Sequence, residues 1–158
     1  MWVRMPTLTP GADADIYIYY GNPAISVSQE NKGGLWNTGY EAVLHLQESG
    51  SGISNEFKNS TLNIHHGTGG DIAGNGNPAR TPDRVAGVIG YAQDFIDSNS
   101  DNIRLNLVPD QAWSALTAQC WVNPDDTGND YVFSKNSCAL TQNTVWKLGK
   151  NSSGVNAI

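Results

Sequence analysis

The chain has 158 residues and a formal net charge of −6, with nine Lys and Arg residues against fifteen Asp and Glu residues. The basic residues are scattered and form no run, so the sequence lacks the positive stripe that binding to nucleic-acid phosphates requires. No apolar stretch approaches the roughly 20 residues of a membrane-spanning helix, and no apolar core of a signal peptide follows Met1. We therefore expect no nucleic-acid partner, no membrane span and no signal peptide in this chain.

Short segments with alternating apolar and polar residues recur along the sequence, separated by many of the seventeen Gly and seven Pro residues. Residues 15–20 show the pattern best, because alternate positions place Ile16, Ile18 and Tyr20 on one face of a strand. The segments predicted as strands are 2–5, 15–20, 42–47, 61–64, 91–95, 103–108, 116–122, 131–134 and 144–148. The one helix candidate, 111–115, is expected to make one turn at most, and the Gly-rich residues 49–84 are expected to be mainly loops. This spacing predicts an all-β protein, an antiparallel β-sandwich or jelly roll, and the composition favours a place outside the cytoplasm.

Several motifs together resemble a known arrangement of two domains. Residues 2–40 contain WVRMPTL, DADIYIYYGNP and LWNTGY and resemble the second half of a bacterial and archaeal domain of unknown function. That domain commonly precedes a laminin G-like jelly roll of the concanavalin A type. Residues 41–158 resemble the first part of this jelly roll, through AVLHLQE, the loop NSTLNIHHGT and the segments 87–105 and 116–135.

The resemblance implies a tail of a small β domain with its linker at 1–40 and the N-terminal part of a concanavalin A-like jelly roll at 41–158. Both domains would be incomplete, so we expect the chain to derive from a longer exported protein that is extracellular or on the cell surface. An incomplete sandwich leaves strand edges unpaired, which favours a homo-oligomer. We expect the self-association at the strand 144–148.

Catalytic motifs are missing from the sequence. Glucanases of the same superfamily place their carboxylates on one strand as Glu-x-Asp-x-Glu, so that both flank one glycosidic bond, and this chain has no such pattern. It also lacks a Gly-x-Ser-x-Gly elbow, a His-Glu-x-x-His motif and a phosphate-cradling loop. We therefore expect a protein that is not an enzyme.

Calcium is the cofactor that the resemblance implies, because lectin-like jelly rolls often bind it in their loops through carboxylate, amide and carbonyl oxygens. The implied ligands are Asn59, Asp97 and Asp101. Asn59 stands where the family usually has Asp, which removes a charge from such a site. Capping of ordinary loops by Asn and Asp explains the same residues equally well. The pair His65 and His66, taken with Asp71, suggests a transition metal less well, because neighbours on a strand point to opposite faces.

Sugar binding is the role that the family implies, and it needs an exposed aromatic ring to stack on a pyranose. The candidates are Trp36, Trp121 and Tyr131, each of which could instead be a core residue of a sandwich. We expect a non-catalytic recognition or adhesion module with a polysaccharide or glycan as ligand. The alternative is a structural spacer or assembly domain of a surface protein that binds no small molecule. The two cysteines, Cys120 and Cys138, are either a disulfide or two buried thiols.

Overall fold

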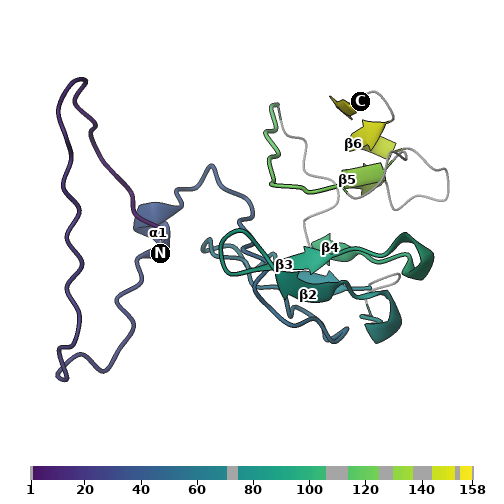
Figure 1. Cartoon of the computed structure of the whole chain (residues 1–158), viewed down its shortest axis with the longest axis horizontal. Coiled ribbons are helices and arrows are strands. Elements are labelled where there is room, and N and C mark those ends of the chain that lie inside the picture. The colour runs from purple at the N-terminus through teal and green to yellow at the C-terminus, as the bar shows by residue number, and fades with distance from the viewer. Residues whose placement is uncertain are drawn as a thin grey trace. The chain divides into compact units, whose positions relative to one another are not determined.

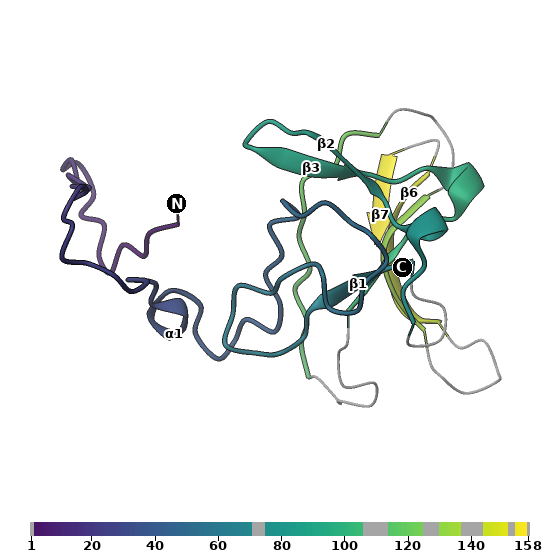
Figure 2. The ribbon, with the colours of Figure 1, turned by 90° about the horizontal axis from the view of Figure 1, so that it is seen from below.

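The computed structural model describes residues 2–70, 75–105, 114–124, 130–136, 144–151 and 154–157. The chain forms two compact units, Met1–Leu107 and Val108–Ile158, and each is described here by itself. Figures 1 and 2 together label α1 and the strands β1–β7. This division differs in position from the predicted domain boundary between residues 40 and 41, which stays a prediction.

Short antiparallel strands and very short helices make up the regular structure of the described residues. The first unit contains α1 (Lys32–Leu35), β1 (Gly67–Gly69), the 3₁₀ helices η1 (Pro78–Arg80) and η2 (Asp97–Asn99), β2 (Asp83–Ala86), β3 (Tyr91–Asp94) and β4 (Ile103–Leu105). The second contains β5 (Asp130–Asn136), β6 (Thr144–Asn151) and β7 (Gly154–Ala157). All four ladders between these strands are antiparallel. The described structure is therefore mostly non-helical, and α1 was not predicted.

The first unit is built around Phe57, whose side chain is fully buried. Phe57 and Gly67 exchange two backbone hydrogen bonds of 2.9 and 2.7 Å, and Gly67 pairs with Leu105 on its other side. A Cβ atom at Gly67 would lie 2.7 Å from a methyl carbon of Ile103 and 3.0 Å from Cβ of Phe57. Glycine at this position therefore lets β4 and Phe57 pack against the backbone of β1 from two sides.

A hairpin formed by β2 and β3 is the second sheet of this unit, and the two strands lie side by side in Figure 2. The turn Gly87–Gly90 closes it, with a hydrogen bond of 2.9 Å from Gly87 N to Gly90 O. The side-chain amide of Gln47 then covers the other edge of β3. Its Oε1 accepts from Tyr91 N at 3.0 Å, and its Nε2 donates to Tyr91 O at 2.9 Å. An amide side chain thus replaces a backbone neighbour at this edge.

Two predicted strands differ from the observed structure for a local reason. Residues 61–63 form bends, and the strand lies later, at β1. Thr61 N donates to Asn59 Oδ1 and Asn63 N donates to Thr61 Oγ1, so side chains take backbone groups that a ladder would need. Residues 42–47 make one isolated bridge, through Leu44, because Leu46 adopts a positive φ of 56°.

Three other predicted strands, 2–5, 15–20 and 116–122, have no ladder partner among the described residues. Their alternating sequences favour extended backbone, but a strand is defined by hydrogen bonds to a neighbour. The predictions at 91–95 and 103–108 are confirmed in β3 and in β4, with residues 106–108 outside the described part. The helix candidate 111–115 lies mostly outside it as well.

The second unit contains a three-stranded antiparallel sheet in the order β5-β6-β7. β5 and β6 confirm the strands predicted at 131–134 and 144–148 and extend them, whereas β7 was not predicted. β6 has a neighbour on both sides, since β5 pairs with it from Thr144 to Lys150 and β7 pairs from Leu148 to Asn151. The expectation that 144–148 is a strand without sheet neighbours is therefore wrong, and the predicted homo-oligomer loses that support.

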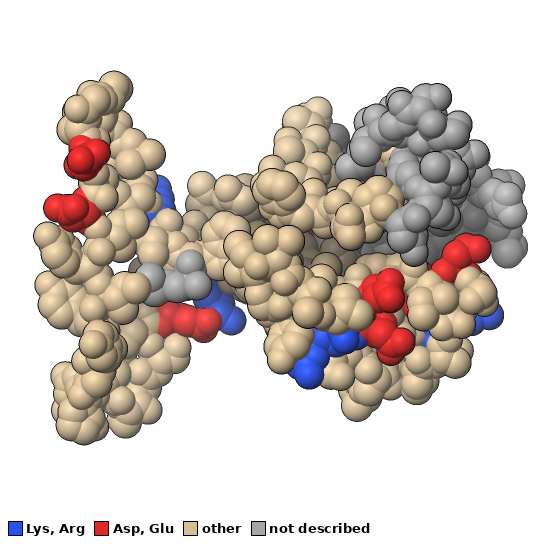
Figure 3. All heavy atoms as spheres, viewed as in Figure 1, with Lys and Arg blue, Asp and Glu red and all other residues tan. Residues whose placement is uncertain are grey.

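No helix within the described ranges is long and apolar enough to cross a membrane. On the face shown in Figure 3, acidic and basic side chains are interspersed among a larger number of uncharged residues.

Candidate functional site

Four ring side chains of the first unit gather into one cluster, formed by Trp2, Trp36, Tyr40 and His45. The ring centroids of Trp2 and Trp36 are 5.6 Å apart and tilted by 59°, and those of Trp36 and Tyr40 are 5.2 Å apart in an edge-to-face arrangement. Trp2 stacks on His45 at 5.5 Å with an angle of 18° between the rings. These separations fall within the range in which aromatic rings attract one another. We call these four residues the aromatic cluster.

Local hydrogen bonds place Trp36 and Tyr40 in this cluster. The side chain of Asn31 caps α1 by accepting from Gly34 N at 2.8 Å, and Trp36 ends the helix with a bond of 2.7 Å from its N–H to Lys32 O. A turn follows at once, in which Tyr40 N donates to the carbonyl oxygen of Asn37 at 3.0 Å. The motif LWNTGY therefore encodes a helix end and a turn that bring its two aromatic residues together.

The N-terminal segment supplies the most exposed ring of the cluster. Trp2 is 62% exposed, although one of its faces stacks on His45. Arg4 fastens this segment to α1, since its Nη1 donates to Gly34 O at 3.0 Å. The cluster thus offers an apolar ring surface beside polar and charged groups.

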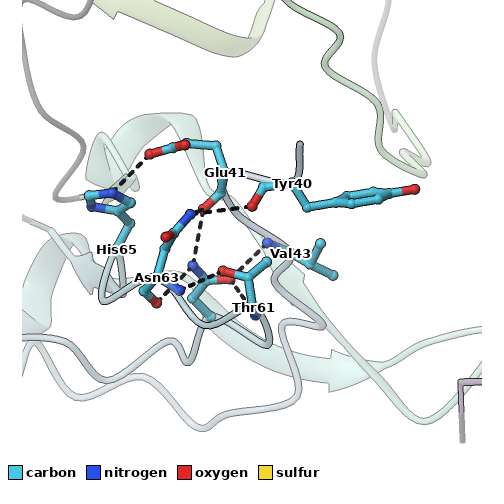
Figure 4. Close-up of polar contacts among 7 residues, drawn as sticks. Tyr40, Glu41, Val43, Thr61, Asn63 and His65 are labelled. Carbon is cyan, nitrogen blue, oxygen red and sulfur yellow. Dashed lines mark hydrogen bonds and ion pairs between the residues drawn. The ribbon is translucent and has the colours of Figure 1, made fainter. Parts of the chain in front are cut away.

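A polar network holds the loop 59–66 against the segment 40–43, as Figure 4 shows. Asn59 is 2% exposed and uses every hydrogen-bonding position of its side-chain amide. Its Oδ1 accepts from Val43 N at 2.9 Å and from Thr61 N at 3.0 Å. Its Nδ2 donates to Glu41 O and to Asn63 O, both at 3.2 Å. The side chain of Asn59 therefore links the two segments through four hydrogen bonds.

Further contacts in the same network come from Asn63 and the two histidines. Asn63 Nδ2 donates to Glu41 O at 3.1 Å, and His65 Nε2 lies 2.9 Å from Glu41 Oε1. His66 Nδ1 accepts from Asn59 N at 3.0 Å, so this nitrogen is unprotonated in the observed arrangement. Neighbouring histidines thus serve different partners, and the predicted metal role of this pair has no support from their contacts. Asp71, the third residue of that hypothesis, lies outside the described residues.

The three predicted calcium ligands differ in what their side chains can offer a cation. Both lone pairs of Asn59 Oδ1 already accept backbone hydrogen bonds, so this oxygen would have to release one to bind calcium. Asp101 Oδ2 accepts from Ile96 N at 2.9 Å, whereas its Oδ1 is buried and has no hydrogen-bond partner. Asp97 begins η2 and is exposed. Within the described residues, no three His, Cys, Asp or Glu side chains gather as a metal-binding group.

A carboxylate that the sequence did not single out holds the loop before Phe57. Glu56 Oε2 accepts from Ser51 N at 2.7 Å, from Ser51 Oγ at 3.0 Å and from Ile53 N at 3.2 Å. Its Oε1 accepts from Gly52 N at 3.0 Å and from Gly69 N at 3.2 Å. The side chain therefore ties the loop to β1, and we assign it a structural role.

The structure brings one of the three predicted sugar-binding aromatics into a cluster. Trp36 joins Trp2, Tyr40 and His45, of which none was predicted. Trp121 and Tyr131 belong to the second unit, where the first is fully exposed and the second is 62% exposed. Cys120, next to Trp121, is an exposed thiol rather than a buried one. Cys138 lies outside the described residues.

No protein-family model matches the chain, and searches of curated proteins and of solved structures give no match either. The resemblance to the concanavalin A-type jelly roll therefore stays a prediction.

Proposed function

We propose that this chain is a non-catalytic recognition module that binds a polysaccharide or glycan through the aromatic cluster. The proposal includes its expected setting, a concanavalin A-like β-sandwich in an exported protein that is extracellular or on the cell surface. The observation that carries it is the Trp2 indole, which contacts the rings of Trp36 and His45 and is still 62% exposed.

Stacking on this indole suits a sugar for two physical reasons. The apolar C–H face of a pyranose removes ring surface from water, and a ring already held by neighbours loses little conformational freedom on binding. Two side chains can bond to the sugar hydroxyls. Tyr40 belongs to the cluster and is 44% exposed, and Arg4 is held at α1 by the bond from its Nη1 to Gly34 O. A guanidinium carries five N–H donors in total, so it can serve a hydroxyl without breaking that bond.

Calcium enters the proposal through Asp101 rather than through Asn59. The buried Oδ1 of Asp101 is an acceptor without a donor, and a cation is one group that satisfies such an oxygen. Asp97 lies four residues earlier and could add a second carboxylate. The ion would shape the loop at η2 and is not required for stacking on Trp2.

The alternative function, a structural spacer, is favoured by the loop 59–66. The resemblance implies a ligand-binding loop here, but the side chains of Asn59 and Asn63 bond to the chain itself. A spacer predicts that no glycan binds, and a recognition module predicts binding that depends on Trp2.

A glycan array, read with and without calcium, distinguishes these functions. The variants are Trp2→Ala, which removes the exposed indole, and Trp2→Phe, which keeps an aromatic face. Trp121→Ala is the matched control, because it removes an exposed indole from the other unit. We expect a signal that Trp2→Ala reduces at least tenfold, that Trp2→Phe partly retains and that Trp121→Ala leaves unchanged, in keeping with about 1–3 kcal/mol for a stacking residue. Binding that is lost in Trp121→Ala instead would move the site to the second unit, and no binding at all would favour the spacer.

A further inference from the structure

The segment 15–20 has the sequence of a strand but pairs with nothing in the described structure. It runs as an extended trace between two turns, Thr9–Ala12 and Asn22–Ile25, and Figure 1 shows it at the purple end of the chain. No backbone group between Asp13 and Gly21 takes part in a hydrogen bond within the described residues. The exposed fractions are 54% for Ile16, 73% for Tyr17, 65% for Ile18 and 93% for both Tyr19 and Tyr20.

The residue types and the unpaired backbone of this segment both favour pairing with another strand. Isoleucine and tyrosine are among the residues that favour β-structure most, and an unpaired extended backbone presents a full row of donors and acceptors. The turns at both ends, with Gly11 at φ 75° and Gly21 at φ 80°, delimit it as one element. The apolar side chains would leave water on pairing, so both backbone and side chains favour a partner strand.

The sequence of the segment is complementary to itself in one antiparallel register. Centring the pair on Ile18 places Ile16 opposite Tyr20, Tyr17 opposite Tyr19 and Ile18 opposite Ile18 of the second copy, which gives five pairs of large side chains. Centring it on Tyr17 or on Tyr19 gives three such pairs.

The same register also separates the charges and the faces. Asp15 lies opposite Gly21, so no two carboxylates oppose each other across the ribbon. The six side chains of Ile16, Ile18 and Tyr20 from the two copies share one face, because directly opposite residues lie on the same side of an antiparallel pair. The other face carries the four tyrosines Tyr17 and Tyr19.

We propose that two copies of this chain associate through residues 15–20, which pair antiparallel about a two-fold axis at Ile18. This interaction surface is independent of the carbohydrate proposal and of the sheet in the second unit. A two-stranded ribbon is weak by itself and buries less than the roughly 1,200 Å² of a standard interface. We therefore expect a dimer that forms over about ten to several hundred micromolar protein.

The symmetric pairing at Ile18 allows a direct test by charge complementation. Ile18→Lys places two ammonium groups opposite each other, and Ile18→Glu places two carboxylates there, so each variant alone should dissociate at least about tenfold more readily. An equimolar mixture of the two variants should restore a heterodimer. Ile53→Lys is the matched control, because Ile53 is 66% exposed and lies outside the segment.

Sedimentation equilibrium of the full chain at about 10–500 µM, the range expected for the dissociation constant, measures the oligomeric state of the four proteins and of the mixture. Circular dichroism checks that the exposed substitutions leave the fold intact. The expected result is a dimer for the wild type and for Ile53→Lys, a monomer for each Ile18 variant and a dimer for their mixture. A monomeric wild type, or a dimer that persists in both Ile18 variants, would overturn the proposal. A mixture that stays monomeric would overturn the register centred on Ile18.

Discussion

Replacing Asn59 by alanine should weaken the first unit more than any exposed substitution. The amide of Asn59 joins residues 41–43 to the loop 59–66 through four hydrogen bonds, and its side chain is almost fully buried. Alanine leaves two backbone N–H groups, those of Val43 and Thr61, without acceptors. It also leaves the carbonyl oxygens of Glu41 and Asn63 without this donor.

The expected loss follows from the number of these bonds. A hydrogen bond contributes about 0.5–1.5 kcal/mol net, so four of them correspond to about 2–6 kcal/mol of unfolding free energy. Domains of ordinary size are stable by about 5–15 kcal/mol, so the variant should lose a large share of its stability.

Urea unfolding followed by tryptophan fluorescence measures the loss, and amide hydrogen exchange locates it at Val43 and Thr61. Asn22→Ala is the control, because the exposed Asn22 makes one comparable side-chain bond, to Ala24 N at 3.0 Å. A change in unfolding free energy below about 0.5 kcal/mol in Asn59→Ala, the size expected at an ordinary surface position, would refute the role of Asn59 in linking the two segments.

Three further substitutions or reactions test other contacts. Glu56→Gln removes the charge from a side chain that accepts five hydrogen bonds, two of them from Ser51. It should lower the urea midpoint by the equivalent of about 1–3 kcal/mol of unfolding free energy. An unchanged midpoint would contradict the role of Glu56 in holding the loop. His66→Ala should destabilise the unit by about 1 kcal/mol, because the backbone N–H of Asn59 loses its acceptor. His66→Asn should lose less stability, because its Oδ1 can replace Nδ1 as the acceptor. Equal losses of the two variants in thermal melts would argue against that bond. Cys120 is exposed, but partial desolvation by neighbouring atoms raises the pKa of its thiol. Iodoacetamide should therefore react with it somewhat more slowly at neutral pH than with an unfolded peptide thiol, and a pH–rate profile that rises earlier than that of the peptide would disagree.

Local patterns predicted the parts of the fold that depend on neighbouring residues. The strands at 91–95, 131–134 and 144–148 were predictable because each has a partner strand close by in sequence. The segments 15–20 and 116–122 have equally good alternation, but a ladder also needs a second strand in the right place. Periodicity reports which residues could share a face, and it does not supply that partner.

The candidate site shows the same limit at the level of side chains. Trp36 was predicted as an aromatic residue suited to stacking, and the turn after it places Tyr40 nearby. The contacts with Trp2 and His45 depend on how segments distant in sequence fold back, which spacing does not reveal. The resemblance to a lectin-like jelly roll implied Asn59 as a calcium ligand, but its side-chain oxygen satisfies backbone N–H groups when it is buried among them.

The most direct test of the proposed function is the indole N–H signal of Trp2 during titration with a glycan that the array identifies. Protein labelled with ¹⁵N at tryptophan gives one indole signal for each of its five tryptophans. We expect the Trp2 signal to shift with saturation and the Trp36 signal to follow, while the Trp121 signal stays in place. Saturable binding that leaves the Trp2 and Trp36 signals unmoved would contradict recognition through the aromatic cluster.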